Sequence, residues 1–178
     1  MVKLAPIDPK FFSGKFYEIW NSGWFLLTSG NYEAGEYNCM TISWGSFGCL
    51  WNLPVAMIVV RPSRYTYEII NQHDSFTLCA FPEEFRKDLT YLGTHSGRDG
   101  DKLAQTPLTA CAARRVAAPA FEQAELVIEC RRIYWQDLLP ENFQDARIPP
   151  HYPQGDHHRM LVGEIVAVSG DAHKYAAH

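Results

Sequence analysis

Two nearby segments decide how this chain folds: Asn38-Cys39-Met40-Thr41-Ile42-Ser43-Trp44-Gly45 and Arg61-Pro62-Ser63-Arg64-Tyr65-Thr66-Tyr67-Glu68. The first alternates in polarity and predicts a strand that ends in a polar, glycine-containing turn. An apolar run over 54–60 predicts a buried strand, which leads to two arginines and to Ser63, the expected N-cap of a helix over 65–72. Because helix N-termini and cations both attract negative charge, this order of elements predicts an anion-binding site.

The rest of the chain predicts further strands with few helices between them. Strands are expected at 24–28, 37–44, 54–60, 75–81, 124–135 and 160–169, with strand pieces in 106–121. A second helix is expected at 82–92, and 45–48 is expected to form a flexible corner. Hairpin-length turns dominate, and helices follow only two of the strands. The pattern therefore favours a mainly β fold, an antiparallel barrel with two or more short helices, over a doubly wound sheet.

The chain length predicts one domain. Its 178 residues are expected to form a single domain over 1–170, followed by a disordered tail over 171–178. Residues 137–158 are rich in proline and polar residues and are too long for an ordinary connection. This segment is expected to be a functional flap or a dimer contact.

Charge and composition argue against several classes of partner. A net charge of −4 and a pI near 5.9 argue against a nucleic acid or an anionic membrane held by bulk electrostatics, so any anion site must be local. The chain has no apolar run of the ~20 residues that span a bilayer, and its N-terminal residues lack the apolar core of a signal peptide, so we expect a cytoplasmic protein.

Cysteine and histidine spacing does not predict a metal site. The five cysteines include no Cys-x-x-Cys pair and are expected to be buried small hydrophobic residues. The triplet Asp156-His157-His158 fits no zinc or iron motif.

Several motifs in a fixed order give the chain a resemblance to a known family. Besides the two segments above, the motifs are Ser96-Gly97-Arg98-Asp99-x-Asp101-Lys102, Glu125-Leu126-Val127-x-Glu129-Cys130, and His158 ahead of Gly163-Glu164-Ile165-Val166. Together they resemble the flavin reductase-like, FMN-binding split-barrel family, and within it the flavoredoxin group. The resemblance implies an antiparallel Greek-key split β-barrel that forms a homodimer, with FMN bound near the dimer interface.

The resemblance also implies which residues hold the flavin ring. Those residues are Asn38, Met40 and Thr41 along the ring, Trp44 at its flank and His158 at its edge. By their chemistry alone, Asn38, Thr41 and Ser43 are suitable hydrogen-bond donors to the ring edge, where such contacts tune the redox potential. The alternatives are that Asn38 closes a hairpin and that Trp44 packs in the core.

The second segment and a later lysine are implied to hold the phosphate or the ribityl chain. They are Arg61, Ser63, Arg64 and Thr66, with Lys102 as a further cation. A phosphate near neutral pH favours backbone N–H groups, hydroxyls and cations, and this segment offers all three. The alternatives are an ordinary capped helix with solvated arginines and a surface lysine at position 102.

The resemblance implies an FMN-binding oxidoreductase that passes electrons from NAD(P)H to free flavin or to a redox protein partner. A flavoredoxin-type electron carrier without useful NAD(P)H activity, or a protein that only stores or senses FMN, are the alternatives. The chain lacks the Gly-x-Gly-x-x-Gly motif of a separate dinucleotide-binding domain, so NAD(P)H would have to stack on exposed flavin. No catalytic acid or base is predicted, and His158 is the only candidate for one.

Overall fold

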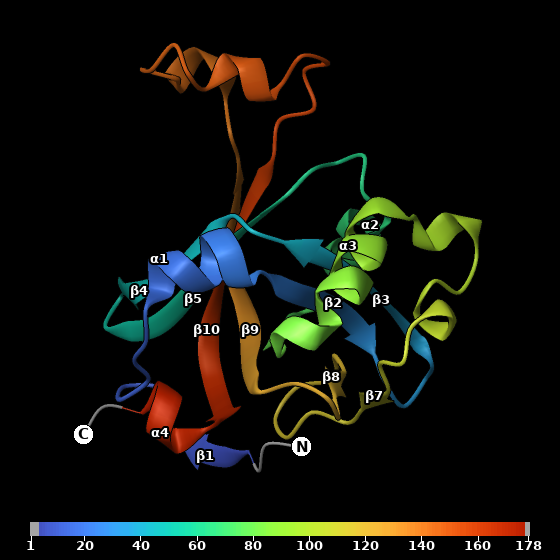
Figure 1. Cartoon of the computed structure of the whole chain (residues 1–178). Helices are drawn as coiled ribbons and strands as arrows, with labels where there is room; N and C mark the ends of the chain where they lie inside the picture. Colours follow the sequence, from blue (N-terminus) through green and yellow to red (C-terminus); the bar gives the residue numbers. More distant parts are fainter. Residues whose placement is uncertain (1–3, 177–178) are drawn as a thin grey trace.

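The computed structural model describes residues 4–176 and consists mainly of β-strands (Figure 1). The strands are β1 (Ala5–Ile7), β2 (Phe25–Asn31), β3 (Glu36–Ile42), β4 (Gly45–Leu50), β5 (Leu53–Val60), β6 (Ser75–Ala80), β7 (Ala110–Cys111), β8 (Ala120–Phe121), β9 (Leu126–Asp137) and β10 (Arg159–Gly170). The α-helices are α1 (Phe16–Glu18), α2 (Tyr65–Gln72), α3 (Arg86–Thr94) and α4 (Ala172–Tyr175). Shorter helical turns lie at Ile19–Gly23, Glu83–Phe85, Gly97–Asp99, Leu103–Gln105, Pro140–Asn142 and Pro149–His151.

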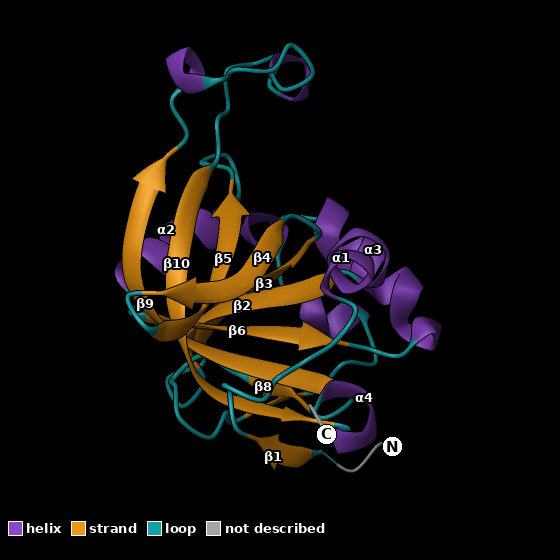
Figure 2. Cartoon of the chain, turned by 90° about the vertical axis from the view of Figure 1, so that its left-hand side faces the viewer, coloured by secondary structure: helices purple, strands orange, loops and turns teal. Residues whose placement is uncertain are grey.

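An eight-stranded antiparallel sheet forms the body of the molecule (Figure 2). Its strand order is β3-β2-β6-β9-β10-β5-β4, with β1 added to β10, while β7 and β8 form a separate pair. Within residues 4–176 no ladder joins β3 to β4, the two ends of this order. Only Ser43 and Trp44 separate these strands, so the free edges meet there and leave a seam. The predicted antiparallel barrel is confirmed.

Alternation along the strands divides the buried side chains between two cores. Leu27 and Leu78 belong to a hydrophobic cluster to which the strands β2, β3, β5, β6, β9 and β10 contribute side chains. Their neighbours Leu26 and Cys79 face a second cluster, which α3 and β8 complete. Successive strand residues point to opposite faces, and these strands are apolar on both faces because both are covered. Full burial of each such leucine stabilises the fold by roughly 1.5–3 kcal/mol.

Helices α2 and α3 lie beside β2 and β3 (Figure 1). The predicted bounds of α2 are confirmed, but the prediction that Ser63 caps this helix is wrong. Arg64, in an extended conformation, precedes the first turn, and no side chain caps it. The hydroxyl of Ser63 instead donates to Oδ2 of Asp156 at 2.6 Å, because an acidic side chain from the distant 138–158 segment reaches it. No helix in the described residues is long and apolar enough to cross a membrane.

Strand β4 occupies the place where a flexible corner was expected. Gly45–Leu50 pairs with β5 along its length, so the prediction for 45–48 is wrong. Glycines are unfavourable inside strands, so the glycines of this segment predicted a turn instead of a strand. They are tolerated here because β4 is an edge strand, where fewer side chains must pack. Cys49 is exposed on this edge, whereas Cys39, Cys79 and Cys130 are buried as expected.

The 138–158 segment, called the arm from here on, joins β9 to β10 and projects beyond the sheet in both views (Figures 1 and 2). Its returning end is fastened to the end of β5. The Arg61 guanidinium donates to the carbonyl oxygens of His151 at 2.9 Å and Asp156 at 3.0 Å. The arm is thus a distinct element whose returning end is held against the body of the fold. Its role as a flap or dimer contact stays a prediction.

The end of the chain is more ordered than the sequence predicts. Residues 172–175 form α4, whose N-cap Asp171 accepts a hydrogen bond from the His173 backbone N–H. Tyr175 is buried, and its hydroxyl donates to Oε1 of Glu125 at 2.6 Å. The expectation of a disordered tail is therefore wrong for 171–176, because one aromatic side chain docks this segment. Residues 177–178 lie outside the described residues.

Candidate functional site

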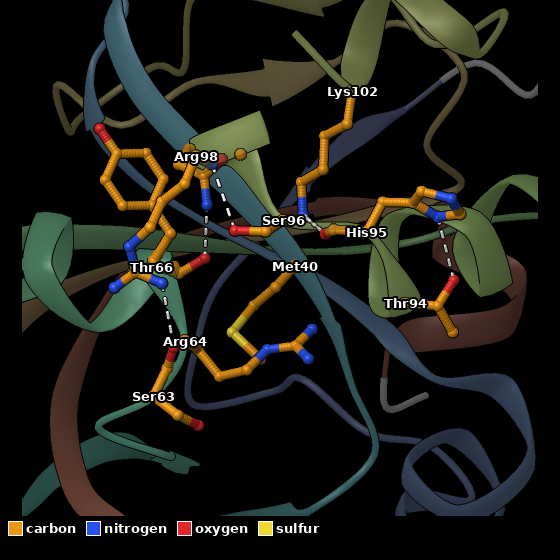
Figure 3. A pocket seen from close by; sticks show the side chains of 12 residues that line it. Met40, Ser63, Arg64, Thr66, Thr94, His95, Ser96, Arg98 and Lys102 are labelled. Atoms are coloured by element: carbon orange, nitrogen blue, oxygen red, sulfur yellow. Dashed lines mark hydrogen bonds between the residues drawn. The ribbon is translucent and has the colours of Figure 1, made fainter. Parts of the chain in front are cut away.

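A small cavity, called the cationic pocket here, opens between β3, the first turn of α2 and the end of α3. Its volume is about 150 Å³. Figure 3 shows Lys102 and Arg64 entering it from opposite sides, with Met40 between them. The lining residues are Asn38, Met40, Ser63, Arg64, Tyr65, Thr66, Thr94, His95, Ser96, Gly97, Arg98 and Lys102. None of them is acidic.

Backbone carbonyls at the end of α3 hold the two central cations. Lys102 Nζ donates to the carbonyl of Leu92 at 2.8 Å and to that of His95 at 3.0 Å, and the Arg64 guanidinium donates to the carbonyl of Gly93. Carbonyls at a helix C-terminus carry partial negative charge and suit cations. Lys102 is 7% exposed, so the reading of it as a surface lysine is wrong.

No carboxylate side chain lines the pocket, although the Asp156 charge partly offsets the lowering of the Arg64 pKa. Burial, and then the Arg64 charge, lower the pKa of Lys102, while burial and the Arg61 charge lower the pKa of Arg64. Positive charge gathered in a partly buried space is unfavourable until an anion joins it. The pocket is therefore prepared for a negatively charged group.

Arg98 contributes less free charge than Lys102 or Arg64. Its guanidinium pairs with Glu68 on α2 and donates to the Ser63 carbonyl at 3.0 Å. It also lies over the Tyr65 ring, 5.3 Å from the ring centre. Arg98 thus fastens the 96–98 turn to the first turn of α2, and this turn supplies one wall of the cationic pocket.

The floor of the cationic pocket is a hydrogen-bonded pair from β3 and α2. Asn38 Nδ2 donates to Thr66 Oγ1 at 2.7 Å, and both side chains are buried. Thr66 lies in the first turn of α2, where backbone N–H groups have no carbonyl partner inside the helix. Gly97 closes over this pair, and a Cβ added there would lie 2.2 Å from Asn38 Oδ1. Only glycine allows the loop to approach so closely.

A second cavity, called the seam pocket here, lies where β3 and β4 part. Its volume is about 300 Å³. It shares Met40 and Arg64 with the cationic pocket, so the two cavities adjoin, and together they are called the groove from here on. The lining residues are Met40, Thr41, Ile42, Ser43, Trp44, Val59, Arg61, Arg64, Gly93 and His158. This half is wider and combines aliphatic and aromatic surface with a few polar groups.

His158 brings the arm to the edge of the seam pocket. Its ring lies 5.2 Å from the Trp44 ring, and its Nδ1 lies 2.9 Å from the Tyr152 hydroxyl. Burial, and then the Arg61 charge, lower the pKa of His158 to about 4. The imidazole is therefore neutral near pH 7 and can act as a hydrogen-bonding group without a charge.

The fold brings all the predicted site residues to this groove. Asn38, Ser63, Thr66 and Lys102 line the cationic pocket; Thr41, Ser43, Trp44, Arg61 and His158 line the seam pocket; Met40 and Arg64 line both. In the seam pocket, Thr41 and Arg61 donate to protein carbonyls. The Thr41 hydroxyl donates to the Leu89 carbonyl at 2.5 Å, and Arg61 anchors the arm. Trp44 is 42% exposed, so it is not a core residue.

Sequence reasoning missed part of the cationic pocket. Tyr65, Thr94, His95, Ser96, Gly97 and Arg98 line it without having been assigned to the site. The Ser96-Gly97-Arg98 motif was a usable signal, because it stands only a few residues before Lys102. Thr94 and His95 carry no such signal, and only the end of α3 places them there. Among residues 4–176 no group of three or more metal-ligating side chains gathers.

The fold is a split barrel, and its groove pairs a cationic pocket with a wider pocket of aliphatic and aromatic surface. The family model described as "Flavin reductase like domain" matches residues 19–177. This chain belongs to that flavin-binding family.

Comparisons with single proteins give a sequence relative and several solved structures of the same fold. An uncharacterized protein from Archaeoglobus fulgidus is 27% identical over 151 residues, 84% of this chain and 73% of that protein. The flavoredoxin from Methanosarcina acetivorans has a TM-score of 0.64 and 25% identity, covering 83% of this chain and 68% of that one. The flavoredoxin of Desulfovibrio vulgaris (Miyazaki F) has a TM-score of 0.63 and 23% identity, and the match covers 82% of this chain and 67% of that one. An FMN-binding domain of a flavin reductases-like enzyme from Shewanella baltica OS155 has a TM-score of 0.68 and 18% identity, and the match covers 97% of this chain and 80% of that one.

Proposed function

We propose that this protein binds FMN in the two-part groove and works as an oxidoreductase. The observation that carries the proposal is that a cationic pocket lined by no carboxylate adjoins a wider seam pocket, with Met40 and Arg64 lining both. FMN has the same two parts, a dianionic phosphate and a flat, mostly apolar ring joined by a polar chain. Family membership and the structural likeness to the FMN-binding domain from Shewanella baltica OS155 support FMN over other anionic ligands.

We assign the phosphate end to the cationic pocket. Lys102 and Arg64 supply charge, and the first turn of α2 supplies backbone N–H groups. The Thr66 hydroxyl accepts from Asn38, so its own proton remains for the ligand. Ser63 is less suited to this role than the sequence suggests, because its hydroxyl already donates a hydrogen bond to the Asp156 carboxylate.

We assign the ring end to the seam pocket. Met40 separates the two halves, Trp44 offers an aromatic wall, and His158 offers a neutral ring nitrogen at the edge. Of the two hydroxyl groups in the lining, that of Ser43 is the one left to donate to a ligand, because the Thr41 hydroxyl donates to the Leu89 carbonyl. When bound, FMN supplies hydride-accepting and electron-transfer chemistry, while these residues orient it and set its electrostatic surroundings.

The electron route is proposed on the family resemblance. Electrons would enter from NAD(P)H stacked on exposed flavin and leave to free flavin or to a redox protein, in a cytoplasmic homodimer. A flavoredoxin-type carrier without useful NAD(P)H activity is the second candidate, favoured by the likeness to the Methanosarcina acetivorans flavoredoxin at 25% identity.

Anaerobic mixing separates the two candidates. We expect purified protein supplied with FMN to show flavin absorbance that bleaches rapidly when NADH or NADPH is added. Flavin that stays oxidised with both nucleotides, but bleaches with a reduced protein donor, would support the carrier. A protein that leaves the FMN spectrum unchanged and retains no flavin after desalting would contradict both.

Gly97→Ala tests the closed wall of the cationic pocket. The added methyl group must push Asn38 away and break its bond to Thr66. Loss of one hydrogen bond worth about 1 kcal/mol should weaken FMN binding roughly five-fold, measured by quenching of flavin fluorescence.

Gly48→Ala is the matched control for that substitution. Gly48 lies on β4, and no atom would lie within 4 Å of an added Cβ. Its FMN affinity should equal that of the wild type. Equal FMN affinities for Gly97→Ala and the wild type would show that Asn38 and Thr66 do not contribute to FMN binding.

A further inference from the structure

Tyr152 connects the arm to the seam pocket. Its side chain is 8% exposed, its ring stacks on Phe143 at 5.7 Å, and the Arg61 guanidinium lies 4.9 Å from its centre. Arg61 also holds the arm through backbone carbonyls on either side of Tyr152. Phe143 and Arg61 both contact the ring, so they restrict its position and that of its hydroxyl.

That hydroxyl determines which nitrogen of His158 carries the proton. Tyr152 Oη and His158 Nδ1 lie 2.9 Å apart. If His158 donated its Nδ1 proton, the phenol proton would have no acceptor among the described residues, although the side chain is buried. A buried polar hydrogen without a partner is unfavourable, so the phenol donates and Nδ1 accepts. In a neutral imidazole the proton then lies on Nε2.

The Nε2 side of His158 is the side left for a ligand. Among residues 4–176 no group forms a hydrogen bond with Nε2, and this atom is not among the fully buried polar atoms. His158 lines the seam pocket beside Trp44. An N–H group there can donate to a ligand oxygen or nitrogen.

We propose that Tyr152 is a positioning residue that holds His158 in the Nε2–H tautomer, so that His158 donates a hydrogen bond to an uncharged carbonyl oxygen or ring nitrogen in the seam pocket. The identity of that ligand as the flavin ring rests on the proposed function. The tautomer itself does not, because it follows from the protein's own contacts. The arm thereby becomes part of the binding site.

Two charged groups, Arg61 and Asp156, act on the His158 ring, and two further histidines contact its neighbours Trp44 and Tyr152. Arg61 comes from the end of β5, while His151, Asp156 and His157 belong to the arm. Arg61 favours the neutral imidazole and Asp156 favours the charged one, with burial as the main influence toward the neutral form. The Tyr152 hydroxyl adds to the neutral side, because it donates to a nitrogen that protonation would occupy.

Nitrogen-15 NMR of the histidine rings, recorded on flavin-free protein across pH, tests the tautomer. In the wild type we expect a protonated Nε2 and an unprotonated Nδ1 for His158 at pH 7. In Tyr152→Phe, which keeps the ring and its stacking, we expect a mixture of tautomers and an upward shift of the His158 pKa by about half a unit to one unit. A wild-type Nδ1–H tautomer, or an identical tautomer and pKa in Tyr152→Phe, overturns the proposal.

Tyr134→Phe is the matched control, because it removes a hydroxyl that donates to Gln136 near the exposed end of β9. It should leave the His158 signals at their wild-type positions, and a shift equal to that in Tyr152→Phe would overturn the assignment to Tyr152.

Adding FMN to the same samples separates this proposal from the proposed function. A wild type that binds no FMN refutes the proposed function while the tautomer result stands. If FMN binds, we expect the His158 Nε2 signal to shift. Bound FMN with an unshifted Nε2 signal overturns the donor role of His158.

Discussion

Arg64→Gln should weaken FMN binding ten- to a hundred-fold. Arg64 is the one cation that lines both halves of the groove, and its pKa is lowered by burial and by Arg61. Removing it should cost about one hydrogen bond to a charged group, roughly 1.5–3 kcal/mol, which corresponds to that loss in affinity. The measurement is a fluorescence titration of flavin-free protein with FMN, with circular dichroism to confirm the fold.

Arg147→Gln on the arm gives the same chemical change away from the groove. Its side chain is 88% exposed and pairs with Asp145. Its FMN affinity should match the wild type. If Arg64→Gln binds FMN as tightly as Arg147→Gln does, the phosphate does not lie in the cationic pocket.

Acid should destabilise the flavin-free protein through His158. The folded-state pKa of His158 is about 4, below its ordinary value of 6.5. Between these values the unfolded chain binds a proton that the folded chain does not, so the contribution is fully present above about pH 6.5 and is lost as pH falls toward 4. From pH 7 to pH 4.5 this residue should lower the free energy of unfolding by about 2 kcal/mol. Urea titrations at the two pH values measure it.

His158→Gln should remove that share of the pH dependence, since glutamine does not titrate. His173→Gln, at an exposed position on α4, should keep the wild-type difference between the two pH values. A His158→Gln variant that loses as much stability in acid as the wild type would show that His158 titrates alike in both states.

Local pattern predicted most of the fold because the long strands are strongly apolar. The strand near 54–60 and the helix at 65–72 were predicted almost to the residue, since β-branched runs and a helical start after Arg-Pro-Ser are strong local signals. β4 was missed because its glycines resemble a turn, and α4 was missed because its order depends on Tyr175 docking against Glu125. Both depend on contacts with residues distant in sequence.

The site shows the same division between local and distant contacts. Residue types predicted an anion site at 61–66, but not that Ser63 and Arg61 would turn toward the arm. Lys102 had no local signal of burial, because the carbonyls that hold it belong to the end of α3. Tyr152 had no local signal of a role in the site either, because only the path of the arm places its hydroxyl against His158.

A comparison of FMN with riboflavin tests the two-part groove most directly. Riboflavin keeps the ring and the ribityl chain but lacks the phosphate, so both ligands can fill the seam pocket and only FMN can use the cationic one. We predict that flavin-free protein binds FMN at least about ten-fold more tightly than riboflavin, because charge-assisted contacts are each worth about 1.5–3 kcal/mol. Equal dissociation constants for the two ligands, or no binding of either, would contradict the account.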